Sequence, residues 1–517
     1  MSLDMAPHIR KISENPSITN PLTTMIEQLK TTGIRLLAVS AFLMNAAAQT
    51  TSQPSASVSG LATTNQPSPT LLQKIKQPVP WMNWGADLRI RNEYFNNLLT
   101  LNPNDAKNLH EQDYFRFRAR IWTTVTPVDD VSVFARLTTE PREWMNHAGY
   151  SPYKGHPGLD MTEGIFDGLN VQWRNILQQP VTATVGRQDI FLGDGWLVGE
   201  GTPYDGSWTT YLDAGRLTYE MKEQHTVFEA IGIIQDAYDD GWLPTINSQN
   251  RIETEQNEKG AIFSVANTSV REANVTGYFI YKHDNRLNGV DGKLGDNADI
   301  YTIGGRLTGL LGDHWKYSAE GAYQFGRKQD TNIIDQAVHF SASSATAYRT
   351  LNAYGFNSKL TWLAKDKLNN QLNVSFEFLS GDNPNSKNDE MFDVLWGRWP
   401  RWSEIGLYSY AAETRIGQEA NLIRVGPGWS ITPMKNLDFS AAYYALFAPE
   451  SVPTREASST LFRGDGNFRG HFVQGVLKYK FNSHVSGHLW AECLFPGDYY
   501  VNRNPIPFFR AEMAFAF

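Results

Sequence analysis

Three arginines stand at alternate positions in one short stretch of the chain. Arg116, Arg118 and Arg120 are separated by Phe117 and Ala119. Alternate side chains of an extended strand point to the same face, so these guanidinium groups would form a ladder on one side. A guanidinium group matches the geometry of a carboxylate, and a ladder of three repels itself unless acids or an anionic ligand lie opposite. The stretch therefore predicts either a network of ion pairs that stiffens or plugs the interior, or a path for an anionic solute.

Further charged residues lie opposite the apolar positions of other alternating stretches. A charged side chain that faced lipid at mid-depth would cost about 2 to 4 kcal/mol, which favours placing these charges inside a closed structure. The arginines expected along an inner path are Arg89, Arg91, Arg116, Arg118, Arg120, Arg136, Arg216, Arg306 and Arg424. Acidic residues such as Glu93 and Glu140 have the same orientation, so both interpretations of the arginines stay open.

The stretches that carry these charges alternate with a period of two, which is typical of amphipathic strands. In the last stretch, Phe509 and Phe517 fall on one face, and Arg510 and Glu512 fall on the other. About 18 such stretches, of roughly the length that a tilted membrane strand needs, alternate with short turns and long loops. Residues 81–517 are therefore expected to form an all-β transmembrane antiparallel barrel of about 18 strands. A soluble all-β sandwich is the alternative, but it has no reason to keep this order of short and long connections.

The N-terminus has the order of a secretory signal. The apolar run Ile34–Met44 follows Lys30 and precedes the small residues Ala46–Ala48. This order predicts a signal peptide over residues 1–48, with a short buried helix as the alternative. Met25 is a candidate for the true start, because the stretch before it is long and polar for such a signal. Residues 49–80 are rich in Ser, Thr, Pro and Gln, which predicts a disordered periplasmic tail.

Several classes of function are disfavoured by composition and motifs. The net charge of -8 argues against a nucleic-acid partner. Cys493 is the only cysteine, which excludes an intramolecular disulfide framework and a multi-cysteine metal site. The sequence has no glycine-rich nucleotide loop in an α/β context and no histidine pair at metal spacing, so neither an enzyme nor a cofactor is expected.

Two motifs resemble those of the alginate export porin family of Gram-negative outer membranes. The first runs from Val185 through Gly186-Arg187-Gln188 to Ile190, before the glycine-rich segment Leu192–Leu197 and the strand that begins near Tyr211. The second is Phe378–Asn383 followed by Met391-Phe392-Asp393. The resemblance implies 18 strands from about residue 81 onward and a path for alginate or another acidic glycan. It also implies that Arg187 faces the lumen, whereas strict alternation with Val185 places it on the outer face.

The expected function is an outer-membrane channel that passes an anionic polysaccharide or oligosaccharide through an arginine-lined lumen. A general or nutrient-specific porin and a non-conducting structural barrel are the alternatives. Expected partners are the glycan, the lipid of the bacterial outer membrane and the assembly machinery of that membrane. The strand that ends at Phe517 resembles the signal that this machinery recognises. The long loop from Gly381 to Gln418 is expected to cap the outer mouth when no glycan chain is passing.

Overall fold

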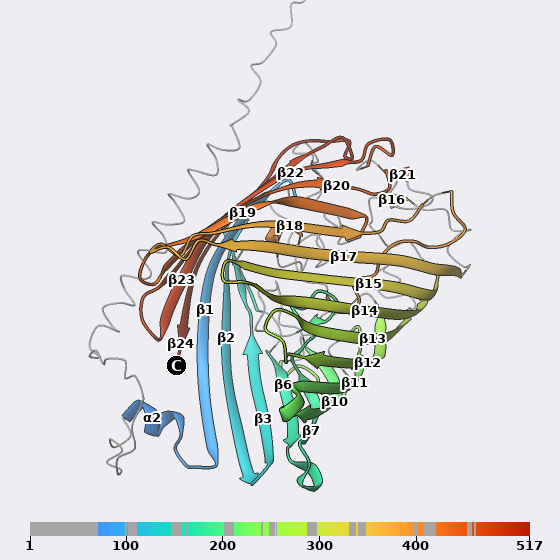
Figure 1. Cartoon of the computed structure of the whole chain (residues 1–517). Helices are drawn as coiled ribbons and strands as arrows, with labels where there is room; N and C mark the ends of the chain where they lie inside the picture. Colours follow the sequence, from blue (N-terminus) through green and yellow to red (C-terminus); the bar gives the residue numbers. More distant parts are fainter. Residues whose placement is uncertain are drawn as a thin grey trace, which may run out of the picture.

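A closed barrel of 18 antiparallel strands makes up most of the part of the chain that the computed structural model describes (Figure 1). The described residues are 71–98, 101, 111–145, 158–161, 164–200, 211–238, 241–247, 254, 256–286, 297–329, 338–339, 348–383, 385–397, 402–406, 420–451, 458–459 and 462–517. The barrel expected from the sequence is therefore confirmed, whereas the proposed signal peptide lies outside the described residues.

The barrel strands follow each other around the ring in chain order, as antiparallel neighbours. They are β1 (Met82–Asn96), β2 (Glu111–Val128), β3 (Val131–Thr139), β6 (Gly164–Trp173), β7 (Val181–Gln188), β10 (Leu212–Met221), β11 (Thr226–Gln235), β12 (Asn257–Asn267), β13 (Asn274–Asn285), β14 (Asn297–Leu311), β15 (Trp315–Gln329), β17 (Arg349–Leu363), β18 (Gln371–Leu379), β19 (Leu422–Met434), β20 (Leu437–Phe447), β22 (Phe468–Lys480), β23 (Val485–Pro496) and β24 (Ile506–Ala516).

The ring closes where the first barrel strand meets the last. β1 pairs with β24 from Asp87 opposite Ala516 to Phe95 opposite Phe508. Beyond the end of β24, the backbone N–H of Phe517 donates to the carbonyl of Ala86 at 2.8 Å. Each barrel strand thus has a neighbour on both sides. This closure satisfies the backbone groups that a bilayer core could not hydrate.

The two faces of the barrel strands differ as their alternation predicts. On the outside, Val185 and Ile303 are 63% and 56% exposed. On the inside, Arg510 forms an ion pair with Glu93 and is fully buried. Phe509 lies on the opposite face of β24 from Arg510 and is buried against Tyr94. The expected inward orientation of the charges on the last strand is confirmed.

Short turns and long connections lie at opposite ends of the barrel, and outer-membrane barrels place the short turns on the periplasmic side. The short-turn end includes the 3-10 turns η1 (Ile176–Gln178) and η2 (Lys222–Gln224). Asp130 and Asn436 have positive φ in two other short turns, a conformation that Asp and Asn tolerate. In the described part of the chain, the long-loop end carries six further short strands, of which the first two extend the barrel sheet next to β2 and the other four form two separate pairs. These are β4 (Arg142–Trp144), β5 (Gly158–Asp160), β8 (Ile190–Phe191), β9 (Gly199–Glu200), β16 (Val338–His339) and β21 (Ser458–Ser459).

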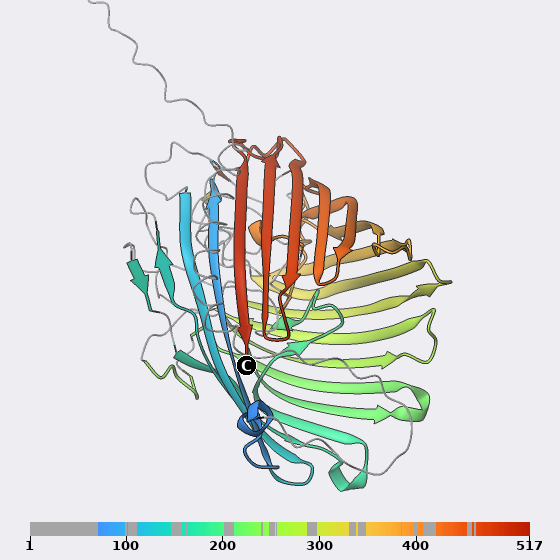
Figure 2. The same cartoon turned by 90° about the vertical axis from the view of Figure 1, so that its left-hand side faces the viewer.

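A short helix, α2 (Leu71–Lys76), precedes the barrel and lies near the C-terminus (Figure 2). The indole N–H of Trp84 donates to the carbonyl of Ile75 at 2.6 Å, and the ammonium of Lys76 lies 5.3 Å from the ring centre of Phe517. The segment predicted to be a disordered tail therefore ends in an ordered helix. Within the described residues, no helix has the length and apolar character to cross a membrane.

Candidate functional site

Two segments from the long-loop end enter the barrel and lie against each other inside it. The first, residues 189–200, carries β8 and β9, and the second follows β18 and is described over 385–397. The N–H of Gly199 donates to the carbonyl of Trp396, and the N–H of Trp396 donates to the carbonyl of Leu197, both at 3.0 Å. The described part of the second segment, which was expected to cap the outer mouth, lies against the inner wall near the long-loop end, and closure of the mouth stays a prediction.

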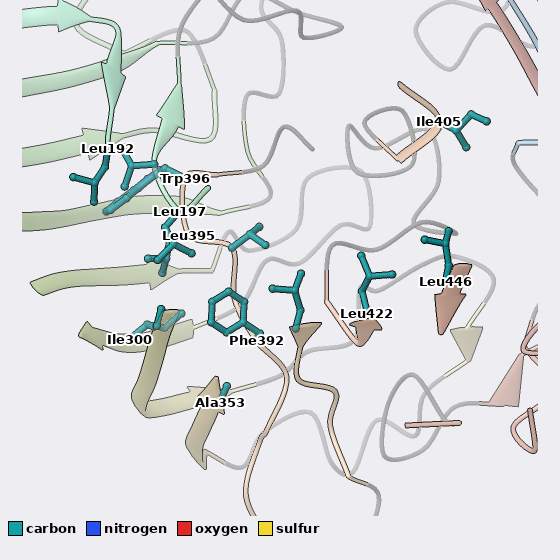
Figure 3. Packing of buried hydrophobic residues seen from close by; sticks show 14 of the residues in the cluster. Leu192, Leu197, Ile300, Ala353, Phe392, Leu395, Trp396, Ile405, Leu422 and Leu446 are labelled. Carbon is teal, nitrogen blue, oxygen red and sulfur yellow. The ribbon is translucent and has the colours of Figure 1, made fainter. Parts of the chain in front are cut away.

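Apolar side chains of the inner wall pack against these inserted segments (Figure 3). Trp396 is completely buried, and Phe392 lies near Ile300 in the same apolar cluster. Two glycines of the wall make this approach possible. A Cβ on Gly260 would lie 2.6 Å from the Trp396 ring, and one on Gly355 would lie 2.8 Å from the Phe392 ring. The lumen is therefore partly filled by a hydrophobic core that belongs jointly to the wall and the segments.

The second sequence motif anchors the segment after β18. The Ser380 hydroxyl donates to the carbonyl of Glu390 at 2.6 Å and accepts the N–H of Tyr354 at 3.1 Å. The carboxylate of Asp382 accepts from the Arg349 guanidinium at 2.8 Å. These bonds hold the start of the inserted segment to β17, so the residues of the motif have a structural role.

Asp393, the last residue of that motif, fixes the segment to two further strands. Its backbone N–H and carbonyl bond the side-chain amide of Gln324 at 2.8 and 2.7 Å. Its carboxylate lies 3.8 Å from the ammonium of Lys282 and 3.7 Å from that of Lys328. This residue therefore connects the inserted segment to β13 and β15 through both its backbone and its charge.

A later part of the same connection, residues 402–406, is fixed to the opposite wall. The carboxylate of Glu492 on β23 accepts the backbone N–H groups of Glu404 and Ile405 at 3.0 Å. Glu404 in turn contacts Arg510 at 2.5 Å, and the carbonyl of Trp402 accepts from Gln474 at 2.8 Å. Because residues 385–397 are held by β13 to β17, the connection has anchors on both sides of the lumen.

Five arginines and four glutamates form a charged cluster on the inner face of β1, β2 and β24. The arginines are Arg89, Arg91, Arg116, Arg118 and Arg510, and the acids are Glu93, Glu140, Glu404 and Glu512. Glu140 is shared by three of the arginines, at 3.3 Å from Arg89, 3.5 Å from Arg116 and 3.9 Å from Arg118. This arrangement supports the structural interpretation of Arg116, which has no exposed surface.

Arg118 and Arg120, at the short-turn end of the arginine ladder, line a cavity. This cavity of about 190 Å³ lies at the short-turn end, beside the turn between β22 and β23. Its lining includes Arg89, Arg118, Arg120 and Lys480, with Asp87 as the acidic residue among them. Arg120 forms a bidentate pair with Asp87, and 15% of its side chain stays exposed. The cavity is therefore predominantly basic.

The remaining arginines expected in the lumen are each held by a carboxylate. Arg136 contacts Asp167 and Asp189, Arg216 contacts Glu229, Arg306 contacts Asp194, and Arg424 contacts Glu377. The Arg424 guanidinium also stacks 4.7 Å from the Tyr444 ring centre. Of these side chains Arg216 is the most exposed, at 32%. These residues come from strands spread around the barrel, so the structure brings only the residues of β1 and β2 together as one group.

The implied lumen position of Arg187 is wrong. The strand register places Arg187 opposite Leu169 and Asp213, on the same outer face as the exposed Val185. Its guanidinium contacts Asp213 at 3.0 Å and lies 3.7 Å from the Tyr211 ring centre. The preceding Gly186 has φ of 122°, and a Cβ there would lie 2.3 Å from the Leu169 carbonyl. Strict alternation thus predicted this position better than the resemblance did.

Solved structures of three porins share the fold at low sequence identity. OccAB1 of Acinetobacter baumannii has a TM-score of 0.51 at 9% identity, covering 84% of this chain and 96% of its own. OpdK of Pseudomonas aeruginosa with vanillate has the same TM-score and identity, over 84% and 98%. A BenF-like porin from Pseudomonas fluorescens Pf-5 has a TM-score of 0.51 at 11% identity, over 84% and 98%.

The match of the sequence to a protein family spans the barrel wall from its first strand to the start of its last strand. Curated proteins give no match to the chain. The family model described as alginate export matches residues 80–507. Family and fold are those of transport porin barrels of the outer membrane. The chain therefore belongs to the alginate export family.

Proposed function

We propose that this outer-membrane channel conducts an anionic polysaccharide or oligosaccharide built of uronate sugars. The basic side chains of its inner wall would serve as successive binding sites for the carboxylates. The family described as alginate export supports this class of substrate. The proposal rests on the outer-membrane barrel and on one local observation, the basic cavity at its short-turn end.

That cavity is the part of the lumen best suited to carboxylates. Arg89, Arg118, Arg120 and Lys480 line it against the single acidic residue Asp87. Guanidinium groups bind carboxylates through paired hydrogen bonds, and an ammonium group adds a mobile point charge. A sugar carboxylate that reached the cavity would therefore meet an excess of positive charge.

Because neighbouring arginines share the carboxylates of the wall, each arginine would bind a sugar carboxylate with only moderate affinity. Glu140 holds both Arg89 and Arg118 while leaving Arg118 12% exposed. Conduction requires sites that attract the solute and still release it, and several moderate sites in series achieve this better than one strong site. The glutamates would therefore orient the arginines and limit their affinity for each uronate.

A channel for small carboxylates is the second candidate. The inserted segments fill part of the lumen, with Trp396 and Phe392 buried against the wall. A similar fold is found in OpdK, whose structure contains vanillate, a small aromatic carboxylate. A narrow lumen with basic side chains suits such a solute as well as a sugar chain. The two candidates differ in the length of the solute, which makes them separable.

Recordings from the full-length mature barrel in planar bilayers test the proposal. We expect reversal potentials in a KCl gradient to show anion preference, and we expect short uronate oligomers to interrupt the current. A neutral oligosaccharide of the same length is the matched control and should leave the current unchanged. Block by uronate oligomers should weaken as salt rises, because screening shortens the reach of the charges.

Each outcome assigns the function differently. Block by vanillate without block by uronate oligomers would favour the small-carboxylate channel. Block by neither, together with a large and unselective current, would indicate a general porin. The absence of any current would indicate a structural barrel and would overturn the proposal.

A further inference from the structure

A row of charged residues crosses the outer face of four neighbouring strands, near the long-loop end. Lys259 on β12 lies opposite His283 on β13, His283 lies opposite Asp299 on β14, and Asp299 lies opposite Arg327 on β15. These strands lie side by side in the wall (Figure 1). The row is on the outside because the flanking residue Ile300 belongs to the apolar cluster in the lumen. This outward row takes no part in the lumen described above.

The carboxylate of Asp299 organises the row. It accepts from the His283 ring at 2.8 Å, from the Arg327 guanidinium at 2.8 Å and from the Tyr281 hydroxyl at 2.9 Å. Arg327 nevertheless stays 62% exposed. Within the described residues, Lys259 has no carboxylate partner and is exposed. The row thus contains two permanent cations, Lys259 and Arg327, and a single carboxylate, Asp299, which already accepts three hydrogen bonds.

Aromatic and apolar rows lie below the charged row, toward the middle of the barrel wall. Tyr281, Tyr301 and Phe325 are stacked along the next register line, with ring centres 5.0 and 5.4 Å apart. One line further, Phe263 and Ile303 are 55% and 56% exposed. Aromatic girdles mark the level of the lipid headgroups, and the apolar band below them faces the acyl chains. The charged row therefore lies at or just beyond the headgroup level of the external leaflet.

We propose that Lys259 and Arg327, oriented through Asp299, bind the phosphate-bearing headgroup of an anionic lipid in the external leaflet. Guanidinium and ammonium groups are the usual partners of phosphate, and exposed basic residues at a membrane surface attract anionic lipid. The stacked rings beneath would contact the glycerol or sugar part of the same lipid. This site is independent of the solute that the lumen conducts.

Lipid retention by the purified full barrel tests this proposal. The barrel in neutral detergent is titrated with phosphatidylglycerol, with phosphatidylcholine of the same chains, and with inorganic phosphate, and bound lipid is counted by native mass spectrometry. We expect phosphatidylglycerol to be retained over phosphatidylcholine. Lys259→Gln with Arg327→Gln should weaken this retention about 30-fold, because two surface charges are lost.

The matched control is Arg271→Gln. Arg271 is 64% exposed and paired with Asp313 at 3.7 Å, but it lies at the short-turn end of the same group of strands. This control should retain phosphatidylglycerol as the wild type does, and heat-modifiable migration confirms that each variant forms the barrel. Equal retention of both lipids, or unchanged retention by the double variant, would overturn the proposal. Displacement of the lipid by an equal concentration of inorganic phosphate would overturn it in favour of a site for free phosphate.

Discussion

The carboxylate of Glu492 accepts the backbone N–H of Glu404, with the nitrogen 3.0 Å from each oxygen. Residues 402–406 are thereby fixed to β23, across the lumen from the strands that hold residues 385–397. Removal of the charge at position 492 should loosen this anchor. A charge-assisted hydrogen bond contributes about 1.5 to 3 kcal/mol, so Glu492→Gln should raise the population of the released segment by about 10-fold to 100-fold. Single-channel recording should then show more frequent steps to a larger conductance, whereas Glu223→Gln on η2 should not change the current.

Neighbouring arginines of the ladder should respond differently to substitution. Arg118→Gln with Arg120→Gln removes two groups that line the basic cavity, so anion preference and uronate block should both decline. Arg116→Met should instead lower stability by about 3 to 5 kcal/mol, because Glu93 and Glu140 lose a buried partner. Reversal potentials measure the first effect and urea unfolding in vesicles measures the second. Lys365→Gln, on an exposed turn, is the control. If the double variant has the same ion selectivity as the wild type, the solute does not pass through the cavity.

Trp396 should control the width of the lumen. Its ring is completely buried against the backbone of Gly260 and joins the two inserted segments. Trp396→Ala should cost about 3 to 5 kcal/mol of packing and raise the single-channel conductance, because the segments lose their shared core. Trp362→Ala, on the outer face, removes the same kind of side chain from the lipid side and should leave conductance unchanged. Equal conductance in the two variants would show that the segments do not limit the current.

The anchoring of the segment after β18 should depend on pH. Burial and the nearby Asp382 carboxylate raise the pKa of Asp389 from 3.8 to about 6, against the effect of Lys328 and Arg349. Since the anchored state then binds a proton more tightly than the released state, anchoring should weaken as the pH rises from about 4 to about 6. Conductance should therefore increase over this range. Asp389→Asn should remove the increase, whereas Asp313→Asn on an exposed short turn should keep it.

The alternation of polar and apolar residues was sufficient to predict the barrel wall. A period of two determines which face each side chain takes, so the inward orientation of Arg510 and the outward orientation of Arg187 both follow from it. The resemblance to a family gave the wrong side for Arg187, because a motif names residues without fixing the face they occupy. Local periodicity is thus the more reliable guide within a strand.

The filling of the lumen could not be predicted in the same way. Ile262 and Ile280 lie on the inner face between polar residues such as Lys282, and they are buried in the apolar cluster that the inserted segments share. The identity of the covering segment depends on contacts between residues far apart in the chain, such as Trp396 with Gly260. Glu492 likewise reads as an ordinary lumen charge until residues 402–406 are placed beside it. No spacing in the sequence encodes these pairs.

The pairing of β1 with β24 also determines when the barrel can close during folding. The bond from the Arg510 guanidinium to Glu93 joins residues 417 positions apart. Synthesis therefore delivers one strand of this pair long before the other, and until then β1 and the newest strand both present open edges. Such open edges can pair with strands of other chains, so a wall that lacks its last strand is prone to aggregation. Folding of this wall is consequently completed only when the last dozen or so residues arrive, and a chain truncated before them would remain an open sheet.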